Sequence, residues 1–177
     1  VVPADPRAAR LVLYTDSSMH GAGATLLDTH NCTVRHWRHR YTGADLRRDI
    51  TTLEARAVEM ALEHFADDLR GHDVACFIDN TSTLSGLITG KSPSFELNAV
   101  IIRVRKLAGN CNSLMAAYVN THVNEAADSN SRFLPAPSDS VVWSLNKAAF
   151  LAASSPLGGF LCAAAPSAAS ARPAPLS

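Results

Sequence analysis

The chain has 177 residues, of which 47% are hydrophobic and 18% are charged, so it fits about one globular domain with a sizeable core. Basic and acidic residues balance at 16 each, which excludes a strongly basic chain and requires any basic surface to be local. No apolar run approaches the ~20 residues of a membrane-spanning helix, and no signal peptide is visible, so we expect no membrane partner.

Three β-strand patterns occupy the first forty residues. A short apolar run at 11–15 predicts a buried strand that ends just before Asp16. A second strand is expected at 22–27, after a turn-like segment, and a third at 32–39. Because short turns connect these runs, we expect them to form an antiparallel meander.

From residue 51 the pattern alternates between helix and strand. Thr51 or Thr52 is expected to cap a helix that runs to about residue 69, where Gly71 stops it. The later elements are expected as strand 74–78, helix 80–89, helix 93–107, strand 114–119 and helix 124–133. This order predicts an α/β fold with a five-stranded mixed sheet, three antiparallel strands and then parallel strands, flanked by helices.

The composition changes after Phe133, where residues 134–177 become rich in alanine, proline and serine. Such a segment does not build a packed core of its own. We therefore divide the chain into an N-terminal linker (1–9), one domain (10–133) and a tail or linker (134–177), with a short helix expected near 139–151. Because the chain starts with Val1, we interpret it as a segment of a longer polypeptide.

Two aspartates end two strands of the same design. Asp16 and Asp79 each follow five apolar residues and precede small polar residues. If the two strands are adjacent and parallel, both carboxylates lie at the same edge of the sheet, where α/β folds place their ligands. Like charges at that distance raise each other's pKa unless a cation lies between them.

Two further carboxylates come from predicted helices. Glu54 shares a helix face with Val58, Ala61 and Phe65, whereas Glu59 and Glu63 are expected on another, solvated face. An ionised carboxylate on a packing face needs a metal ion or a buried salt bridge to an arginine, and the sequence leaves both open. Asp128 belongs to the last helix, where a solvated position is the alternative.

Four carboxylates of this kind suit hard divalent cations. Mg²⁺ prefers oxygen ligands, and two ions about 4 Å apart activate a water and stabilise the leaving oxygen of a phosphodiester. That chemistry needs no nucleophilic side chain from the protein. The sequence therefore indicates metal-dependent hydrolysis at Asp16, Glu54, Asp79 and Asp128.

At these positions the chain resembles type 1 ribonuclease H over about residues 10–133, with four motifs in the family's order. The motifs are Tyr14-Thr15-Asp16-Ser17, Thr52-Leu53-Glu54-Ala55, Ile78-Asp79-Asn80 and Asn124-Glu125-Ala126-Ala127-Asp128. The resemblance implies a ribonuclease H-like fold in which Asp16, Glu54, Asp79 and Asp128 are catalytic and bind two Mg²⁺ ions, for which Mn²⁺ can substitute. It also implies cleavage of the RNA strand of an RNA–DNA hybrid, leaving 5′-phosphate ends.

The last motif extends through Ser131-Arg132 and is most similar to retroelement reverse transcriptases of the LTR and tyrosine-recombinase kinds. This resemblance implies an attached polymerase domain and removal of template RNA during reverse transcription. With widely spaced cysteines, it also favours an intracellular, cytoplasmic or nuclear, replication complex. Only residues 88–92 separate the two middle helices, so the basic helix of cellular ribonucleases H is absent.

Five residues are candidates for substrate binding. Ser17 and Asn80 follow catalytic aspartates and can reach a ribose 2′-hydroxyl, with capping of a turn or helix as an equal alternative. Arg38 and Arg40 lie in a basic, aromatic run that either contacts phosphates or forms one solvated strand face with Trp37 packed inward. His122 is the one candidate for the family's mobile histidine, with the structural histidine that precedes it in the family as the alternative match. Positions 103, 105 and 106 are expected on a solvated helix face.

Two other classes of function share this pattern. One is a catalytically silent scaffold module with the same fold, against which the presence of all four carboxylates argues. The other is a related DNA nuclease, such as a junction resolvase or a transposase core. A comparison of hybrid, duplex DNA and duplex RNA as substrates separates these possibilities.

Overall fold

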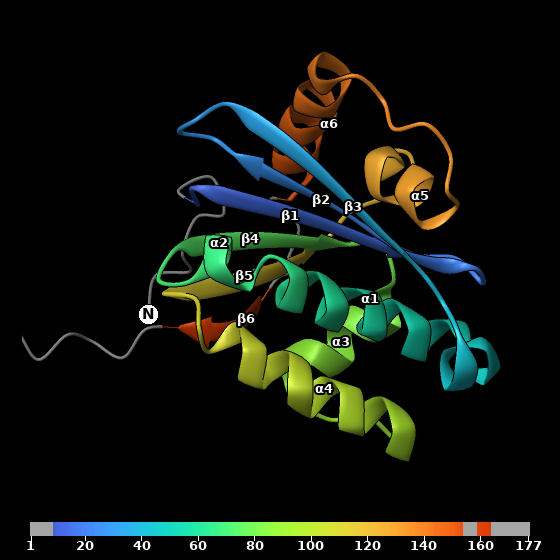
Figure 1. Ribbon diagram of the computed structural model, residues 1–177. Helices are drawn as coiled ribbons and strands as arrows, with labels where there is room; N and C mark the ends of the chain where they lie inside the picture. The colour runs from blue at the N-terminus through green and yellow to red at the C-terminus, as the bar shows by residue number, and fades with distance from the viewer. Residues whose placement is uncertain (1–8, 154–158, 164–177) are drawn as a thin grey trace, which may run out of the picture.

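The protein is a mixed β-sheet with helices on both faces (Figure 1). Its computed structural model describes residues 9–153 and 159–163. The strand order is β3-β2-β1-β4-β5-β6. The strands are β1 (Leu11–Ser17), β2 (Gly21–Asp28), β3 (Thr33–Arg40), β4 (Asp73–Ile78), β5 (Ser113–Tyr118) and β6 (Gly159–Ala163).

The pairing of the strands confirms the predicted sheet. β1, β2 and β3 form an antiparallel meander, and β4 and β5 continue the sheet parallel to β1. A sixth strand, β6, adds to the predicted five by pairing antiparallel with β5. It comes from the part of the chain that the sequence assigns to the tail.

The helices form one layer on each side of the sheet. They are η2 (Gly43–Arg47, a 3-10 helix), α1 (Ile50–His64), α2 (Ala66–Leu69), α3 (Thr81–Thr89), α4 (Phe95–Ala108), α5 (Glu125–Ser131) and α6 (Asp139–Ala152). Figure 1 shows α1, α3 and α4 on one side of the sheet and α5 and α6 on the other.

Side chains of β1 alternate between these two layers, because successive residues of a strand point to opposite faces. Leu11 and Leu13 belong to the core beneath α1 and α4, whereas Val12 and Tyr14 belong to the core shared with α5 and α6. All seven residues of β1 are buried, as expected of a central strand covered on both faces. The last residues of β1 can thus reach both helix layers.

Two predictions about the helix expected at 51–69 are wrong: it is not one continuous helix, and neither Thr51 nor Thr52 caps it. It is interrupted at Phe65, which leaves helical geometry while its ring is 1% exposed in the core, and α2 follows. Its N-cap is Asp49, not Thr51 or Thr52, because the Asp49 carboxylate accepts hydrogen bonds from the Thr52 backbone amide and hydroxyl.

Glu59 was expected in solvent, and this prediction is wrong. Its side chain is 3% exposed and forms ion pairs with Arg56 and Arg103. Arg103 thus ties α4 to α1, while Arg105 donates hydrogen bonds to two carbonyls at the end of α3. Arg103 and Lys106 are nevertheless exposed, as predicted for a solvated helix face, whereas Arg105 is partly buried.

Helix α6 extends the packed structure beyond residue 133. The Tyr14 hydroxyl donates a 2.7 Å hydrogen bond to Asn146, and the rings of Phe77 and Phe150 meet edge to face at 5.3 Å. Val142 and Ala149 are buried in the same core. The division of the chain at residue 133 stays a prediction, but α6 covers one face of β1 and β4. Within the described residues, no helix is long and apolar enough to span a membrane.

Candidate active site

Asp16 lies near the end of the central strand β1 and is 3% exposed. The Ser131 hydroxyl of α5 donates a 2.7 Å hydrogen bond to Asp16 Oδ2. Burial raises the pKa of Asp16 to about 7, although the hydrogen bond from Ser131 lowers it, and the charges of Asp79 and Asp128 raise it further. Asp16 is therefore a buried carboxyl whose ionised form needs more positive charge than the protein supplies.

Glu54 reaches the same place from α1 and is 5% exposed. Its Oε2 atom is buried and has no hydrogen-bond partner among the described residues. Burial raises the pKa of Glu54, and the charges of Asp16 and Asp79 raise it further. A salt bridge to an arginine, the alternative that the sequence left open, does not satisfy this oxygen.

Asp79 directly follows β4 and is half-buried. Because β1 and β4 are parallel neighbours with Thr15 opposite Ile78, Asp16 and Asp79 come next in the same register. The Thr121 hydroxyl contacts Asp79 Oδ2 at 3.4 Å. Burial is the largest influence on the pKa of Asp79 and raises it.

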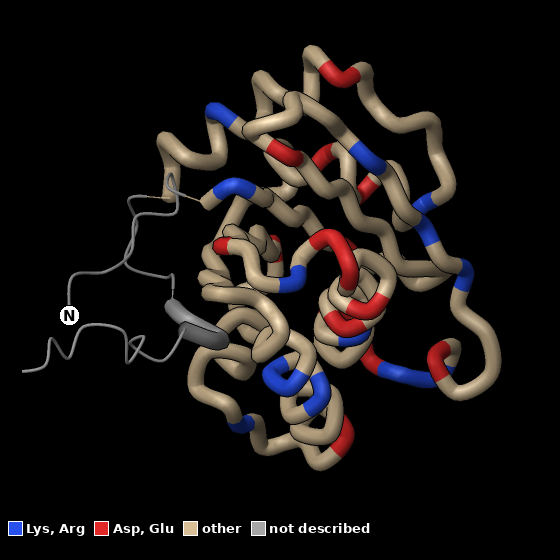
Figure 2. The backbone as a smooth tube through the Cα atoms, turned by 60° about the vertical axis from the view of Figure 1, so that its left-hand side comes forward, with Lys and Arg blue, Asp and Glu red and all other residues tan. Residues whose placement is uncertain are grey.

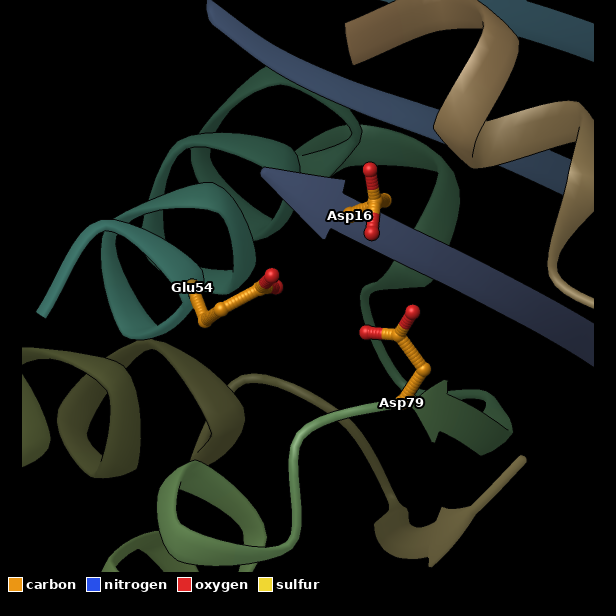
Figure 3. Close-up of side chains that lie close together, drawn as sticks. All are labelled: Asp16, Glu54 and Asp79. Atoms are coloured by element: carbon orange, nitrogen blue, oxygen red, sulfur yellow. The ribbon is translucent and has the colours of Figure 1, made fainter. Parts of the chain in front are cut away.

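These three carboxylates converge on one point. An oxygen of each of Asp16, Glu54 and Asp79 lies within 4.8 Å of the others. Figure 3 shows the three side chains pointing toward one another from β1, α1 and the end of β4. Three like charges at this spacing are costly without a cation, whereas hard divalent ions prefer this set of oxygen ligands. The buried, unpartnered Glu54 Oε2 fits the same interpretation.

Asp128 lies beside this group and is not one of its three members. Its carboxylate pairs at 2.7 Å with Arg132, the C-cap of α5 one turn later, and its side chain is 27% exposed. Its charge nevertheless raises the pKa of both Asp16 and Glu54. Asp128 is thus near enough to act on the site electrostatically, although it is partly exposed and paired with Arg132.

The position of α5 depends on a glycine in β2. A side chain at Gly23 would collide with the Ala127 carbonyl and the Ser131 amide, so the helix backbone lies directly against the strand. Gly23 is opposite Asp16 in the β1–β2 register. This close approach brings Ser131 and Asp128 to the end of β1.

Three supporting residues were missed by the search for charged groups. The Asn124 side-chain amide donates to the Thr15 carbonyl, and the Ser18 hydroxyl donates to the Ser131 carbonyl. Asn130 donates to the Ala24 carbonyl. Asn124 and Ser131 are part of the last sequence motif, so that motif carries the signal for their role in holding α5.

The candidates for sugar contact, Ser17 and Asn80, are engaged within the protein. Asn80 caps α3 by accepting a 2.9 Å hydrogen bond from the Thr83 amide, which is the helix-capping role given above as the alternative to sugar contact. The Ser17 hydroxyl lies 2.7 Å from the Tyr41 hydroxyl. His122 is exposed in the connection between β5 and α5, next to Thr121. Contact of these three residues with substrate stays a prediction.

Arg38 and Arg40 point from the edge strand β3 toward the end of α5. Arg38 donates hydrogen bonds to Asn130 and to the Leu134 carbonyl, and Arg40 lies 4.2 Å from the centre of the Phe133 ring. Trp37 packs on the opposite face and stacks on His64. Figure 2 shows both charge signs interspersed over the chain, so these arginines form a local feature in a balanced molecule.

The fold and the convergence of acids at the ends of β1 and β4 define a protein of the ribonuclease H-like class. A family model described as "RNase H-like domain found in reverse transcriptase" matches residues 7–105, which is more than half of the chain, and the chain belongs to this family. The match includes Asp16, Glu54 and Asp79, whereas Asp128 lies beyond it. No match was found among curated proteins.

Solved structures share the fold at low identity. RNase H1 of the archaeon Halobacterium salinarum is 22% identical with a TM-score of 0.57, over 68% of this chain and 93% of that one. The N-terminal RNase H domain of a Mycobacterium tuberculosis protein is 17% identical with a TM-score of 0.59, over 70% and 97%. A foamy viral protease-reverse transcriptase, solved with an RNA/DNA hybrid, is 13% identical with a TM-score of 0.54, over 75% of this chain and 21% of that longer one.

Proposed function

We propose that this chain is a metal-dependent endonuclease that cleaves the RNA strand of RNA–DNA hybrids. The observation that carries the proposal is the convergence of Asp16, Glu54 and Asp79 within 4.8 Å at the edge of a ribonuclease H-like sheet. Membership of a family found in reverse transcriptases supports the same substrate. In this proposal the chain removes template RNA inside a retroelement replication complex in the cytoplasm or nucleus, next to an attached polymerase domain.

Two Mg²⁺ ions, or Mn²⁺ in their place, would be held by Asp16, Glu54 and Asp79, with Asp128 completing the second site. When bound, they would supply an activated water and stabilise the leaving oxygen of the phosphodiester. These residues fit divalent cations because all of their ligand atoms are oxygens and because the buried Glu54 Oε2 has no hydrogen-bond partner among the described residues.

The residues of the chain hold the carboxylates in place for this chemistry. Ser131 donates a hydrogen bond to one oxygen of Asp16, while Thr121 and Asn124 hold Asp79 from the β5–α5 connection. Asp128, which pairs with Arg132 in this structure, would help to hold the second ion. Such hydrogen bonds to ligand oxygens orient them and tune their basicity.

Arg38 and Arg40 are proposed to neutralise phosphates of the hybrid. Both belong to the edge strand next to α5, and both remain exposed after their contacts with Asn130 and Phe133. Because the net charge is zero, affinity for the hybrid depends on few such contacts, and we expect it to fall only moderately as salt rises, since the salt dependence scales with the number of phosphates neutralised. An attached polymerase domain supplies further affinity in this proposal.

A cleavage assay on matched substrates tests the proposal. The chain is incubated with Mg²⁺ and a labelled hybrid, duplex DNA or duplex RNA, and we expect cleavage of the hybrid only, with 5′-phosphate products. Asp79→Asn keeps the shape of the side chain and is expected to abolish cleavage. Asp128→Asn should reduce the rate less, because that carboxylate is outside the group of three. Cleavage of duplex DNA instead of hybrid would assign the chain to the DNA nucleases, and no cleavage in any arm would assign it to scaffold modules.

A further inference from the structure

The Tyr41 side chain occupies a junction between the elements that carry two of the carboxylates. Tyr41 follows β3 directly and is 2% exposed, with its ring packed among Ala22, Leu53 and Ala57. Its backbone amide donates to the His20 carbonyl, which fixes the end of β3 against the β1–β2 turn. The ring is therefore held by packing and by backbone pairing, independently of its hydroxyl.

The hydroxyl of Tyr41 connects the neighbours of two proposed ligands. It lies 2.7 Å from the Ser17 hydroxyl and donates a 3.2 Å hydrogen bond to the Leu53 carbonyl. Ser17 is the residue after Asp16, and Leu53 is the residue before Glu54. The Ser17 backbone amide also favours the ionised form of Glu54 through a hydrogen bond. One buried oxygen thus links the end of β1 to the first turn of α1.

This link acts against the repulsion between the carboxylates. Asp16 and Glu54 lie on separate elements, and when both are ionised their charges push the end of β1 away from α1. Hydrophobic packing of α1 fixes its general position but is not directional. A hydrogen bond is directional, so the Tyr41 hydroxyl can fix the spacing of the two ligands more closely than packing alone.

We propose that Tyr41 is a positioning residue that sets the spacing of Asp16 and Glu54 for divalent cations through its contacts with Ser17 and the Leu53 carbonyl. The inference rests on the proposed function, because it concerns the same metal site. In this proposal Tyr41 contacts neither substrate nor ion, and it affects only how tightly the ions bind. Loss of a residue that orients a metal ligand typically weakens metal binding 10- to 100-fold.

Tyr14 provides a matched control. It is also buried, and its hydroxyl also makes a 2.7 Å hydrogen bond, but with Asn146 of α6 on the other face of the sheet. Tyr14→Phe and Tyr41→Phe each remove one buried hydroxyl and should lower the thermal midpoint by similar amounts. Only Tyr41→Phe should change the response to Mg²⁺.

The test is a MgCl₂ titration of the thermal midpoint of the full chain, without nucleic acid. We expect Tyr41→Phe to need about tenfold more Mg²⁺ for half of the stabilisation, and Tyr14→Phe to match the wild type. Ser17→Ala breaks the same contact from its other side, so it replaces Tyr41→Phe in the titration if that variant folds poorly. The double variant should need no more Mg²⁺ for half of the stabilisation than either single variant. Cleavage by Tyr41→Phe at saturating Mg²⁺ should recover to within about twofold of the wild type, since only ion binding is weakened.

Three results would contradict the inference, and the first two distinguish its failure from failure of the proposed function. If the wild type responds to Mg²⁺ and Tyr41→Phe responds like Tyr14→Phe, Tyr41 has only a structural role and the proposed function stands. If the wild type shows no response to Mg²⁺, the metal site and the role of Tyr41 both fail. Additive effects of Ser17→Ala and Tyr41→Phe would also contradict a shared contact.

Discussion

The acidic cluster makes a specific prediction about the metal-free protein: its free energy of unfolding should fall as pH rises from 5 to 8. Burial raises the pKa of Asp16 to about 7, whereas the same group in the unfolded chain titrates near 4. The folded state therefore holds a proton that the unfolded state has lost, and stability decreases with pH throughout this interval. The sign is opposite to that of a carboxylate in a salt bridge.

The magnitude follows from the size of this difference. Each pKa unit corresponds to about 1.4 kcal/mol, so Asp16 alone should remove about 2–3 kcal/mol of stability between pH 5 and pH 8. Glu54 and Asp79 have raised pKa values and act in the same direction. His36 opposes them, because burial lowers its pKa and folding then favours its neutral form as pH rises.

Urea denaturation in EDTA at pH 5 and pH 8, followed by circular dichroism, measures the effect. Asp16→Asn removes the titrating group at similar shape, so the difference between its pH slope and that of the wild type isolates Asp16 and cancels His36. With Mg²⁺ the slope should vanish or reverse, because cations bind the ionised carboxylates. Equal slopes for the two proteins in EDTA, or a wild type more stable at pH 8 than at pH 5, would refute the reasoning.

Three further changes test the framework around the site. Gly23→Ala places a methyl group against the backbone of α5, so urea denaturation should show that the free energy of unfolding falls by about 1–3 kcal/mol. Mg²⁺ binding should also weaken, and unchanged Mg²⁺ binding would contradict the proposed dependence of the site on α5. Glu59→Gln breaks a buried ion-pair network and should cost about 3 kcal/mol in the same assay with Mg²⁺ binding intact, which a weakened Mg²⁺ response would contradict. Deletion of everything after residue 137 uncovers Tyr14 and Phe77, and circular dichroism should show a lower thermal midpoint; an unchanged midpoint would mean that α6 adds nothing to the core.

The ends of the strands were predictable because the sequence carries two local signals for them. Each of β1 and β4 contains a continuous, mainly apolar run that is followed directly by an aspartate, and continuous runs are typical of strands covered on both faces. Parallel neighbours then bring Asp16 and Asp79 to one edge without any further assumption. Glu54 was predictable in the same manner, since it is the one acid on an apolar helix face.

Residues whose role depends on contacts between distant segments could not be found in this way. Glu59 looked solvated because helical periodicity describes one helix and does not show that α4 covers its other face. Tyr41 gave no signal either, because its partners Ser17 and Leu53 lie 24 and 12 residues away along the chain. Periodicity describes the faces of a single helix, but it does not show which neighbouring element covers a face or which polar groups meet there.

The difference between ligands and positioning residues explains why the carboxylates are easier to predict from sequence than the side chains that hold them. Hard divalent cations favour carboxylate ligands, so the chemistry of the site restricts which residue types the sequence has to offer. A supporting hydroxyl such as those of Tyr41 and Ser131 need only reach its partner, and many residue types at many positions meet that condition. If the supports set metal affinity as argued, a chain can keep every ligand of this family and still bind Mg²⁺ weakly, so a motif match alone does not establish activity.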